Sequence, residues 1–228
     1  MNFHIITIFP NTFDSYFKES IIGRAIKNKI ISVRFYNPRD YIKDKKKNGY
    51  RPVDDKPYGG GPGMVMRPEP ILKAVGGITK KINRRKISKP KILIINFIPS
   101  AQKFNTIKAK QFSKKYTDII LICGRYEGID ARIDKILKTK KLSIGDYVVT
   151  GGELPAMILI DSISRQIEGV LGKYESLEEE RVSSSEVYTR PEILVYKNEK
   201  KIEKKYKVPK VLLSGNHKKI DEWKHLTK

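Results

Sequence analysis

The chain of 228 residues is 39% apolar and carries 47 lysine and arginine residues against 25 acidic ones, a net charge of +22. This length can bury the core of one domain, alone or with a small appendage, and the charge favours a polyanionic partner, although a solvated lysine-rich surface would give the same count. No apolar run approaches the ~18 residues of a membrane span, and residues 1–6 lack a signal-peptide pattern, so we expect a soluble cytoplasmic protein without a membrane partner.

Strand-like and helical patterns alternate along the first part of the chain. Apolar, β-branched runs predict strands at 3–9, 31–36, 91–97 and 118–123. A helix that Asn11 can cap follows the first of them, with apolar residues at a spacing of four: Phe13, Phe17, Ile21 and Ala25. The last two strand runs are almost continuously apolar, which is typical of strands covered by helices on both faces. The sequence therefore predicts an α/β fold with a parallel sheet.

The segment 37–66 is too long and polar for an ordinary connection, which marks it as functional or mobile. Its glycines lie in the string PYGGGPGM at 57–64. This string has neither the lysine of a Walker A loop nor the spacing of a dinucleotide-binding loop, so nucleoside triphosphate and NAD sites are excluded. A flexible linker is the alternative, but Pro57 and Pro62 stiffen the segment and favour a loop of defined shape.

Two further glycine-bearing segments follow, CGRYEGID at 123–130 and SIGDYVVTGGELP at 143–155. Glycine is favoured where φ is positive or where another backbone or a ligand comes close. In the second segment the glycines could form tight turns around a strand at 147–149. They could equally form a loop at a strand end, where α/β sheets bind ligands. Periodicity alone does not choose between these alternatives.

The amino-acid composition of the chain changes after residue 165. Residues 166–206 are acidic, then rich in serine and lysine, and are interpreted as an exposed linker. Residues 207–228 form a small, mainly helical C-terminal module that is too short for a core of its own. The predicted organisation is therefore a domain at 1–165, a linker at 166–206 and a small C-terminal module at 207–228, which we expect to contact the polyanionic partner.

The three glycine-bearing segments, in this order, resemble the bacterial tRNA (guanine-N1)-methyltransferases of the SPOUT class. The resemblance spans nearly the whole chain, from the GRA string at 23–25 to LLSGNH at 212–217. It implies S-adenosylmethionine-dependent methylation of N1 of guanosine at tRNA position 37, immediately 3′ of the anticodon. It also implies a SPOUT-type α/β sheet with a deep trefoil knot, and a homodimer with a shared active site.

The resemblance implies which residues bind S-adenosylmethionine. They are Ile98, Pro99, Gly124, Glu127, Ile144, Gly145, Asp146, Tyr147, Val148, Val149, Gly151, Gly152 and Pro155. The one cysteine and three scattered histidines have no zinc-ligand spacing, so no protein-bound metal site is predicted. A cluster of carboxylates could still admit Mg²⁺, which prefers oxygen ligands.

Methylation of guanine N1 needs a base for the N1 proton and a cation near O6, where negative charge develops. By resemblance, Arg165 is the catalytic arginine and also contacts RNA; its structural alternative is a helical pair with Asp161 on a solvated face. The base is predicted to be Glu180, where the family usually has the aspartate of an Asp-Ser pair. The alternative for Glu180 is a solvated acidic run in the linker.

The resemblance also implies that Asp54 and Tyr126 hold the target guanosine, the tyrosine by packing near a splayed base. The chain departs from the family at 98–101, IPSA in place of Ser-Pro-x-Gly, and stops soon after Trp223. Two alternatives therefore stay open: a catalytically impaired tRNA-binding protein, and a SPOUT methyltransferase acting at another RNA position. The loop at 59–64 argues against the second.

Overall fold

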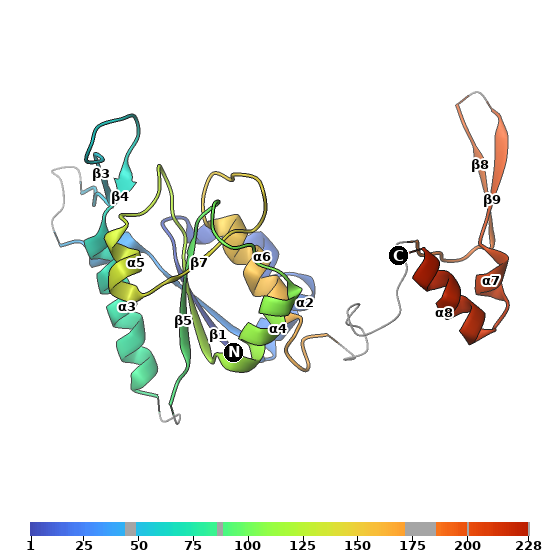
Figure 1. Ribbon diagram of the computed structural model, residues 1–228, viewed down its shortest axis with the longest axis horizontal. Helices are drawn as coiled ribbons and strands as arrows, with labels where there is room; N and C mark the ends of the chain where they lie inside the picture. The colour runs from blue at the N-terminus through green and yellow to red at the C-terminus, as the bar shows by residue number, and fades with distance from the viewer. Residues whose placement is uncertain (44–48, 86–88, 172–185, 200, 228) are drawn as a thin grey trace. The chain divides into compact units, whose positions relative to one another are not determined.

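The computed structural model describes residues 1–43, 49–85, 89–171, 186–199 and 201–227. The chain divides into two compact units, Met1–Gly172 and Lys173–Lys228 (Figure 1). Among the described residues, no helix is long and apolar enough to cross a membrane. The expected cytoplasmic location stays a prediction.

The first unit is built on a parallel sheet of five strands in the order β2-β1-β6-β5-β7. The strands are β1 (Asn2–Ile6), β2 (Ser32–Tyr36), β5 (Ile92–Phe97), β6 (Asp118–Ile122) and β7 (Lys140–Leu142). A separate short pair joins β3 (Asp54–Asp55) to β4 (Val65–Met66). The predicted α/β fold with a parallel sheet is confirmed.

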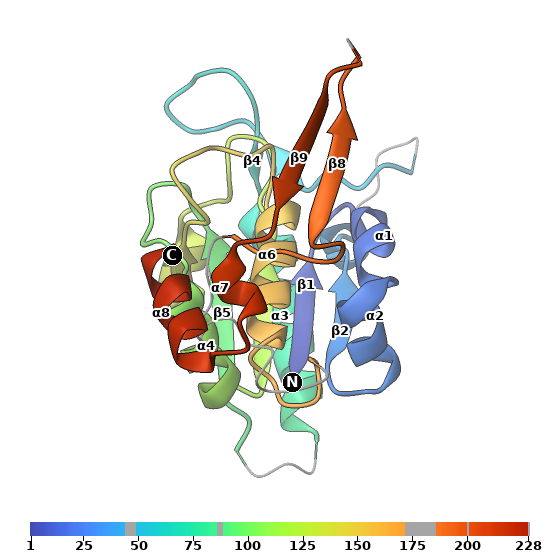
Figure 2. The same ribbon diagram turned by 90° about the vertical axis from the view of Figure 1, so that its right-hand side faces the viewer.

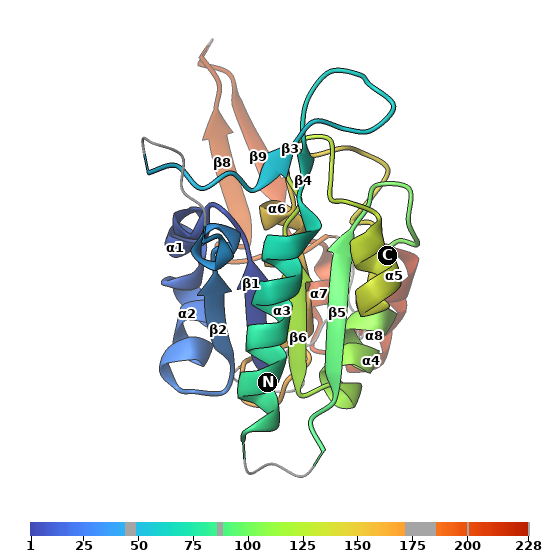
Figure 3. The ribbon, with the colours of Figure 1, turned by 90° about the vertical axis from the view of Figure 1, so that its left-hand side faces the viewer.

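Helices cover both faces of this sheet, so alternate residues of each central strand enter different cores (Figure 3). On one face, Ile119 and Leu121 pack with α2 (Ser20–Lys27), α4 (Thr106–Lys115) and α6 (Glu153–Ser164). On the other, Ile120 and Ile122 pack with α3 (Pro68–Asn83) and α5 (Arg132–Leu137). Burial on both sides explains why β6 is apolar throughout.

The single helix predicted from Phe13 to Ala25 is wrong. The structure has a 3₁₀ turn, η1 (Pro10–Phe13), followed by α1 (Asp14–Phe17) and α2, with a second 3₁₀ turn, η2 (Pro38–Tyr41), after β2. Ser20, at the start of α2, has a φ of +51°, and one residue in this left-handed region interrupts a right-handed helix. The apolar spacing therefore continues across a break in the backbone.

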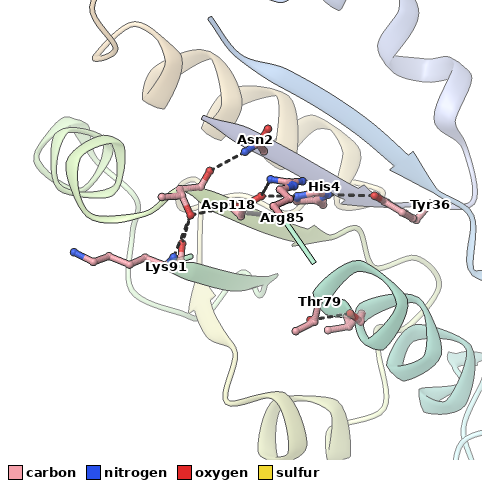
Figure 4. Close-up of polar contacts among 9 residues, drawn as sticks. Asn2, His4, Tyr36, Thr79, Arg85, Lys91 and Asp118 are labelled. Atoms are coloured by element: carbon pink, nitrogen blue, oxygen red, sulfur yellow. Dashed lines mark hydrogen bonds and ion pairs between the residues drawn. The ribbon is translucent and has the colours of Figure 1, made fainter. Parts of the chain in front are cut away.

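A buried polar cluster lies at the amino end of the sheet and includes Arg85, which comes just after α3 (Figure 4). His4 Nε2 is 3.0 Å from Asp118 Oδ1, and Arg85 Nη1 donates to the same oxygen at 2.8 Å. Thr117 donates to the other oxygen, and the Tyr36 hydroxyl lies 3.3 Å from His4 Nδ1. Burial opposes ionisation of Asp118, but these donors hold its pKa below the usual value, whereas burial lowers the pKa of His4.

The second unit contains a hairpin of β8 (Ile193–Lys197) and β9 (Glu203–Lys207), followed by α7 (Lys210–Leu213) and α8 (His217–Leu226) (Figure 2). The hairpin falls almost entirely within 166–206, where the sequence predicts a linker; its first strand is apolar except for Lys197, and it pairs with the lysine-rich second strand. The first unit also extends beyond residue 165, since Val170 packs in its core. The observed boundaries thus differ from the predicted ones.

Candidate functional site

A cavity of about 490 Å³ opens at the carboxyl ends of β5, β6 and β7. Its walls come from the ends of β5 and β7, the residues that follow the three strands, Asp134 of α5 (Arg132–Leu137) and the first turn of α6. The carboxyl edge of a parallel sheet is where α/β folds bind ligands, because the loops that leave neighbouring strands meet there. The cavity therefore collects segments that are far apart in the sequence.

Two glycines allow α6 to begin against the end of β6. A Cβ on Gly152 would lie 2.5 Å from Cys123 Cα, and Gly152 N donates to Gly124 O at 2.9 Å. A Cβ on Gly151 would lie 2.4 Å from Arg125 Nε. At Gly152 the neighbouring atoms are backbone, so a side chain is excluded, whereas at Gly151 a side chain would displace the Arg125 side chain. Gly152 therefore lets the start of α6 lie directly against the end of β6.

An ion pair fixes the same junction from the other side. Arg125 Nε is 2.9 Å from Glu153 Oε2, and Glu153 is only 3% exposed. Thr7 donates to Glu153 Oε1 at 2.7 Å, and the Arg125 guanidinium lies over the Phe9 ring. Glu153 Oε2 accepts no hydrogen bond from Arg125, so the pairing is one of charge, and it joins the loop after β6 to the start of α6.

The first glycine loop reaches this site through the segment 125–130. Glu127 N donates to Met64 O at 3.0 Å, and Met66 N donates to Gly128 O at 2.9 Å. Within the loop, φ is positive at Gly59, Gly60, Gly61 and Gly63, so the backbone follows a path that only glycine adopts easily. The loop is therefore turned and anchored at its end, as the sequence predicts for a loop of defined shape.

Asp54 and Tyr126, the residues predicted to hold the guanosine, lie close together. Tyr126 lines the cavity, and its backbone has a φ of +59°. Burial raises the pKa of the Tyr126 hydroxyl, and the neighbouring carboxylate of Asp54 raises it further. A half-exposed aromatic ring beside a carboxylate, at the rim of the cavity, is suited to hold a base that has left its stack.

All of the residues predicted to bind the cofactor line the cavity except Gly145 and Asp146. These two lie in the same loop, where Asp146 forms an ion pair with Lys103. The alternative of a strand at 147–149 is wrong: the strand is β7, at 140–142, and the residues after Ser143 form a loop. The individual roles of these residues in cofactor binding stay predictions.

Three polar residues in the wall of the cavity lie outside the glycine-bearing segments and escaped the sequence analysis: Asn96, Asp134 and Lys141. Asn96 Nδ2 donates to Asp134 Oδ1 at 2.9 Å, and Lys141 Nζ lies 3.2 Å from Asp134 Oδ2. Burial opposes ionisation of Asp134, but the surrounding donors lower its pKa. The one signal in the sequence was Asn96, a polar residue inside an apolar strand.

Of the two predicted catalytic residues, the structure describes only Arg165. Arg165 follows the last turn of α6, and Glu180 lies outside the described residues. Asp161, the alternative partner of Arg165, accepts a hydrogen bond from the Tyr16 hydroxyl, and among the described residues no ion pair joins it to Arg165. Within that part there is also no group of three or more His, Cys, Asp or Glu residues that could hold a metal ion.

Comparison with known proteins gives a consistent result along the chain. A family model described as tRNA (guanine-1)-methyltransferase TrmD matches residues 1–228. The tRNA (guanine-N(1)-)-methyltransferase of Clostridioides difficile (strain 630) is 49% identical over 228 residues, covering 98% of this chain and 90% of that protein. Its namesake from Buchnera aphidicola subsp. Acyrthosiphon pisum is 42% identical over 226 residues, covering 97% and 87%.

A solved structure shares the fold. The crystal structure of tRNA (m1G37) methyltransferase from Aquifex aeolicus aligns with a TM-score of 0.71 and 37% sequence identity. The alignment covers 98% of this chain and 87% of that chain. The similarity therefore includes the residues around the cavity and is not confined to one motif.

Proposed function

The chain belongs to the tRNA (guanine-1)-methyltransferase family, and we propose that its cavity binds S-adenosylmethionine for methylation of N1 of guanosine 37 in tRNA. The observation that carries this proposal is the cavity itself, which the loops after β5, β6 and β7 form at the carboxyl edge of the sheet. The predicted cofactor residues lie in these loops.

The residues of the cavity fit this cofactor. Ile98, Pro99 and Val149 offer an apolar wall for a planar adenine, while the glycine backbone at 151–152 leaves its surface free of side chains. The polar end formed by Asn96, Asp134 and Lys141 can face a ribose or an amino acid group. When bound, S-adenosylmethionine would supply a methyl group on a positively charged sulfur, and the sulfur would keep the electron pair of the broken S–CH3 bond and leave as a neutral thioether.

The reaction then assigns a role to each polar residue. Tyr126 and Asp54 position the guanine beside the cavity. Glu180 accepts the N1 proton, which frees the N1 lone pair for the methyl group. Arg165 stabilises the negative charge that develops on O6. A requirement for Mg²⁺ stays a prediction from the oxygen ligands that this ion prefers. The deep trefoil knot stays a prediction from the resemblance.

We also propose that the active site is completed in a homodimer. The outer side of α6 supports this, because Leu154 and Ile158, one turn apart, are 55% and 43% exposed. Apolar side chains on a helix that begins at the cavity would gain from burial against a second copy. Dilution to the monomer should then abolish methyl transfer, and full turnover by a species shown to be monomeric by sedimentation would contradict the shared site.

The main test incubates the purified protein with methyl-labelled S-adenosylmethionine and tRNA transcripts that carry either guanosine or adenosine at position 37. We expect methyl transfer to the guanosine transcript only. Repeating the assay with and without added Mg²⁺ shows whether the transfer requires the metal. Reverse transcription should stop at position 37, because a methyl group on N1 blocks base pairing. Binding of both ligands without transfer would support the impaired binding protein, and a stop elsewhere would support a different RNA position.

A further inference from the structure

The hairpin of β8 and β9 has two chemically different faces. In an antiparallel pair, residues that lie opposite one another share a face, and successive residues alternate. The pairing register therefore gathers on one face, here called the aromatic face, Leu194, Tyr196, Lys204 and Tyr206. The opposite face carries Ile193, Val195, Lys197, Glu203, Lys205 and Lys207.

The aromatic face is open to solvent. Every residue of both strands is exposed, and Tyr196 and Tyr206 retain 57% and 48% of their accessible surface. Lys204 lies directly across from Tyr196, and its Nζ is 5.3 Å from the centre of the Tyr206 ring. The acidic residue of the strands, Glu203, is on the opposite face, where it pairs with Lys197 at 3.5 Å.

This combination fits single-stranded nucleic acid better than it fits a protein core. Exposed aromatic rings stack on unpaired bases, and an ammonium group beside them can neutralise a phosphate. The two strands carry four lysines against one glutamate. Burial against an apolar protein surface would therefore remove several charged groups from water without giving them a partner. The charge of the hairpin therefore favours a polyanion as the occupant of the aromatic face.

We propose that the aromatic face of the hairpin is a second tRNA-binding surface, on which unpaired nucleotides stack against Tyr196 and Tyr206 while Lys204 contacts a phosphate. The choice of tRNA as the RNA rests on the proposed function. The opposite face contributes charge but no stacking. Substitutions on the two faces should therefore differ, although they are neighbours in the sequence.

The experiment measures the Kd of full-length variants for a labelled tRNA transcript without cofactor, and separately the single-turnover methylation rate at saturating tRNA. The double variant Tyr196→Ala, Tyr206→Ala should raise Kd at least about tenfold, the usual worth of base stacking. Its rate at saturation should be unchanged. Tyr196→Phe with Tyr206→Phe keeps both rings and should retain affinity, which separates stacking from the hydroxyl groups.

Matched controls come from the opposite face. Val195→Ala should leave Kd unchanged, and Lys204→Gln should weaken binding more than Lys205→Gln, although each removes one charge. Equal Kd for the double variant and the unmodified protein would overturn the proposal, and so would a double variant that changes self-association in sedimentation but not RNA affinity. If alanine disturbs folding, leucine at both positions keeps apolar area without rings and should still lose affinity. A protein that methylates nothing but shows these differences refutes the proposed function and leaves this inference standing.

Discussion

The polar groups at the two ends of the parallel sheet have different partners: at one end they bond to each other, and at the other they line a cavity. At the amino end, Asp118 is enclosed by His4, Arg85 and Thr117, so its charge is satisfied within the protein. At the carboxyl end, loops and glycines surround a cavity of about 490 Å³. The amino end thus resembles a closed ion-pair cluster, whereas the carboxyl end offers polar and backbone groups to a ligand.

This difference indicates what substitutions at each end should do. A buried charge that loses its partner costs folding stability, because the remaining group cannot return to water. A change in the wall of a cavity mainly alters what the cavity holds. Substitutions at the amino end should therefore change the free energy of unfolding, and those at the carboxyl end should change ligand binding or rate.

The largest expected effect is on the proposed methyl-transfer chemistry itself, which depends on the ligand bound in the cavity. Glu180→Gln should lower the single-turnover rate of methyl transfer by roughly 10²- to 10⁴-fold, the usual worth of a positioned general base, without weakening cofactor binding. Arg165→Ala should lose both rate and RNA affinity, and Glu178→Gln is the neighbouring control. If Glu178, Glu179 and Glu180 can each be neutralised without slowing transfer, the base lies elsewhere, and Asp54 becomes the first candidate.

A smaller effect, a loss of S-adenosylmethionine affinity, should follow from adding a side chain at the start of α6. Gly152→Ala places a methyl group 2.5 Å from Cys123 Cα, so the helix must shift and carry the cavity wall with it. We expect an overpacking cost of about 1–3 kcal/mol and at least about a tenfold loss of S-adenosylmethionine affinity by calorimetry. Gly76→Ala is the control, because a Cβ there meets nothing and alanine favours its helix. Unchanged cofactor affinity in Gly152→Ala would contradict the assigned wall.

At the amino end, the comparison predicts a loss of folding stability without a loss of cofactor affinity. Asp118→Asn keeps the shape of the side chain but leaves Arg85 without its carboxylate. We expect the free energy of unfolding, measured with urea, to fall by about 1.5–3 kcal/mol, the usual worth of a hydrogen bond to a charged group. Affinity for S-adenosylmethionine should not change in the folded protein. A variant with normal stability and weakened cofactor binding would break the distinction between the two ends.

The smallest effect concerns pH. His4 has a lowered pKa in the folded protein, so the unfolded chain binds its proton more readily. Its contribution to stability is complete above pH ~6.5, the ordinary value for histidine, and is lost as pH falls toward the lowered folded pKa. The slope is at most about 1.4 kcal/mol per pH unit. His4→Gln should reduce the pH dependence of the free energy of unfolding, measured with urea between pH 7 and 5. His225→Gln, at an exposed position, should leave that pH dependence unchanged.

The sequence alone identifies most of the sheet and many residues of the candidate site. Long apolar runs at 91–97 and 118–123 leave little alternative to buried strands, and the observed β5 and β6 agree closely. The three glycine-bearing segments were also recognisable, because glycine and proline report backbone requirements directly. These signals are local, since each depends on neighbours within a few residues.

Tertiary structure decided what local patterns could not. The run at 147–149 has strand-like residues but forms a loop, while the lysine-rich 140–142 forms β7, because pairing with β5 selects the edge strand. Asn96, Asp134 and Lys141 come from β5, α5 and β7, and meet only when the strand order places those elements together. Periodicity encodes burial and backbone preference. Which distant side chains share a cavity is fixed by the order of the strands, which no short segment contains.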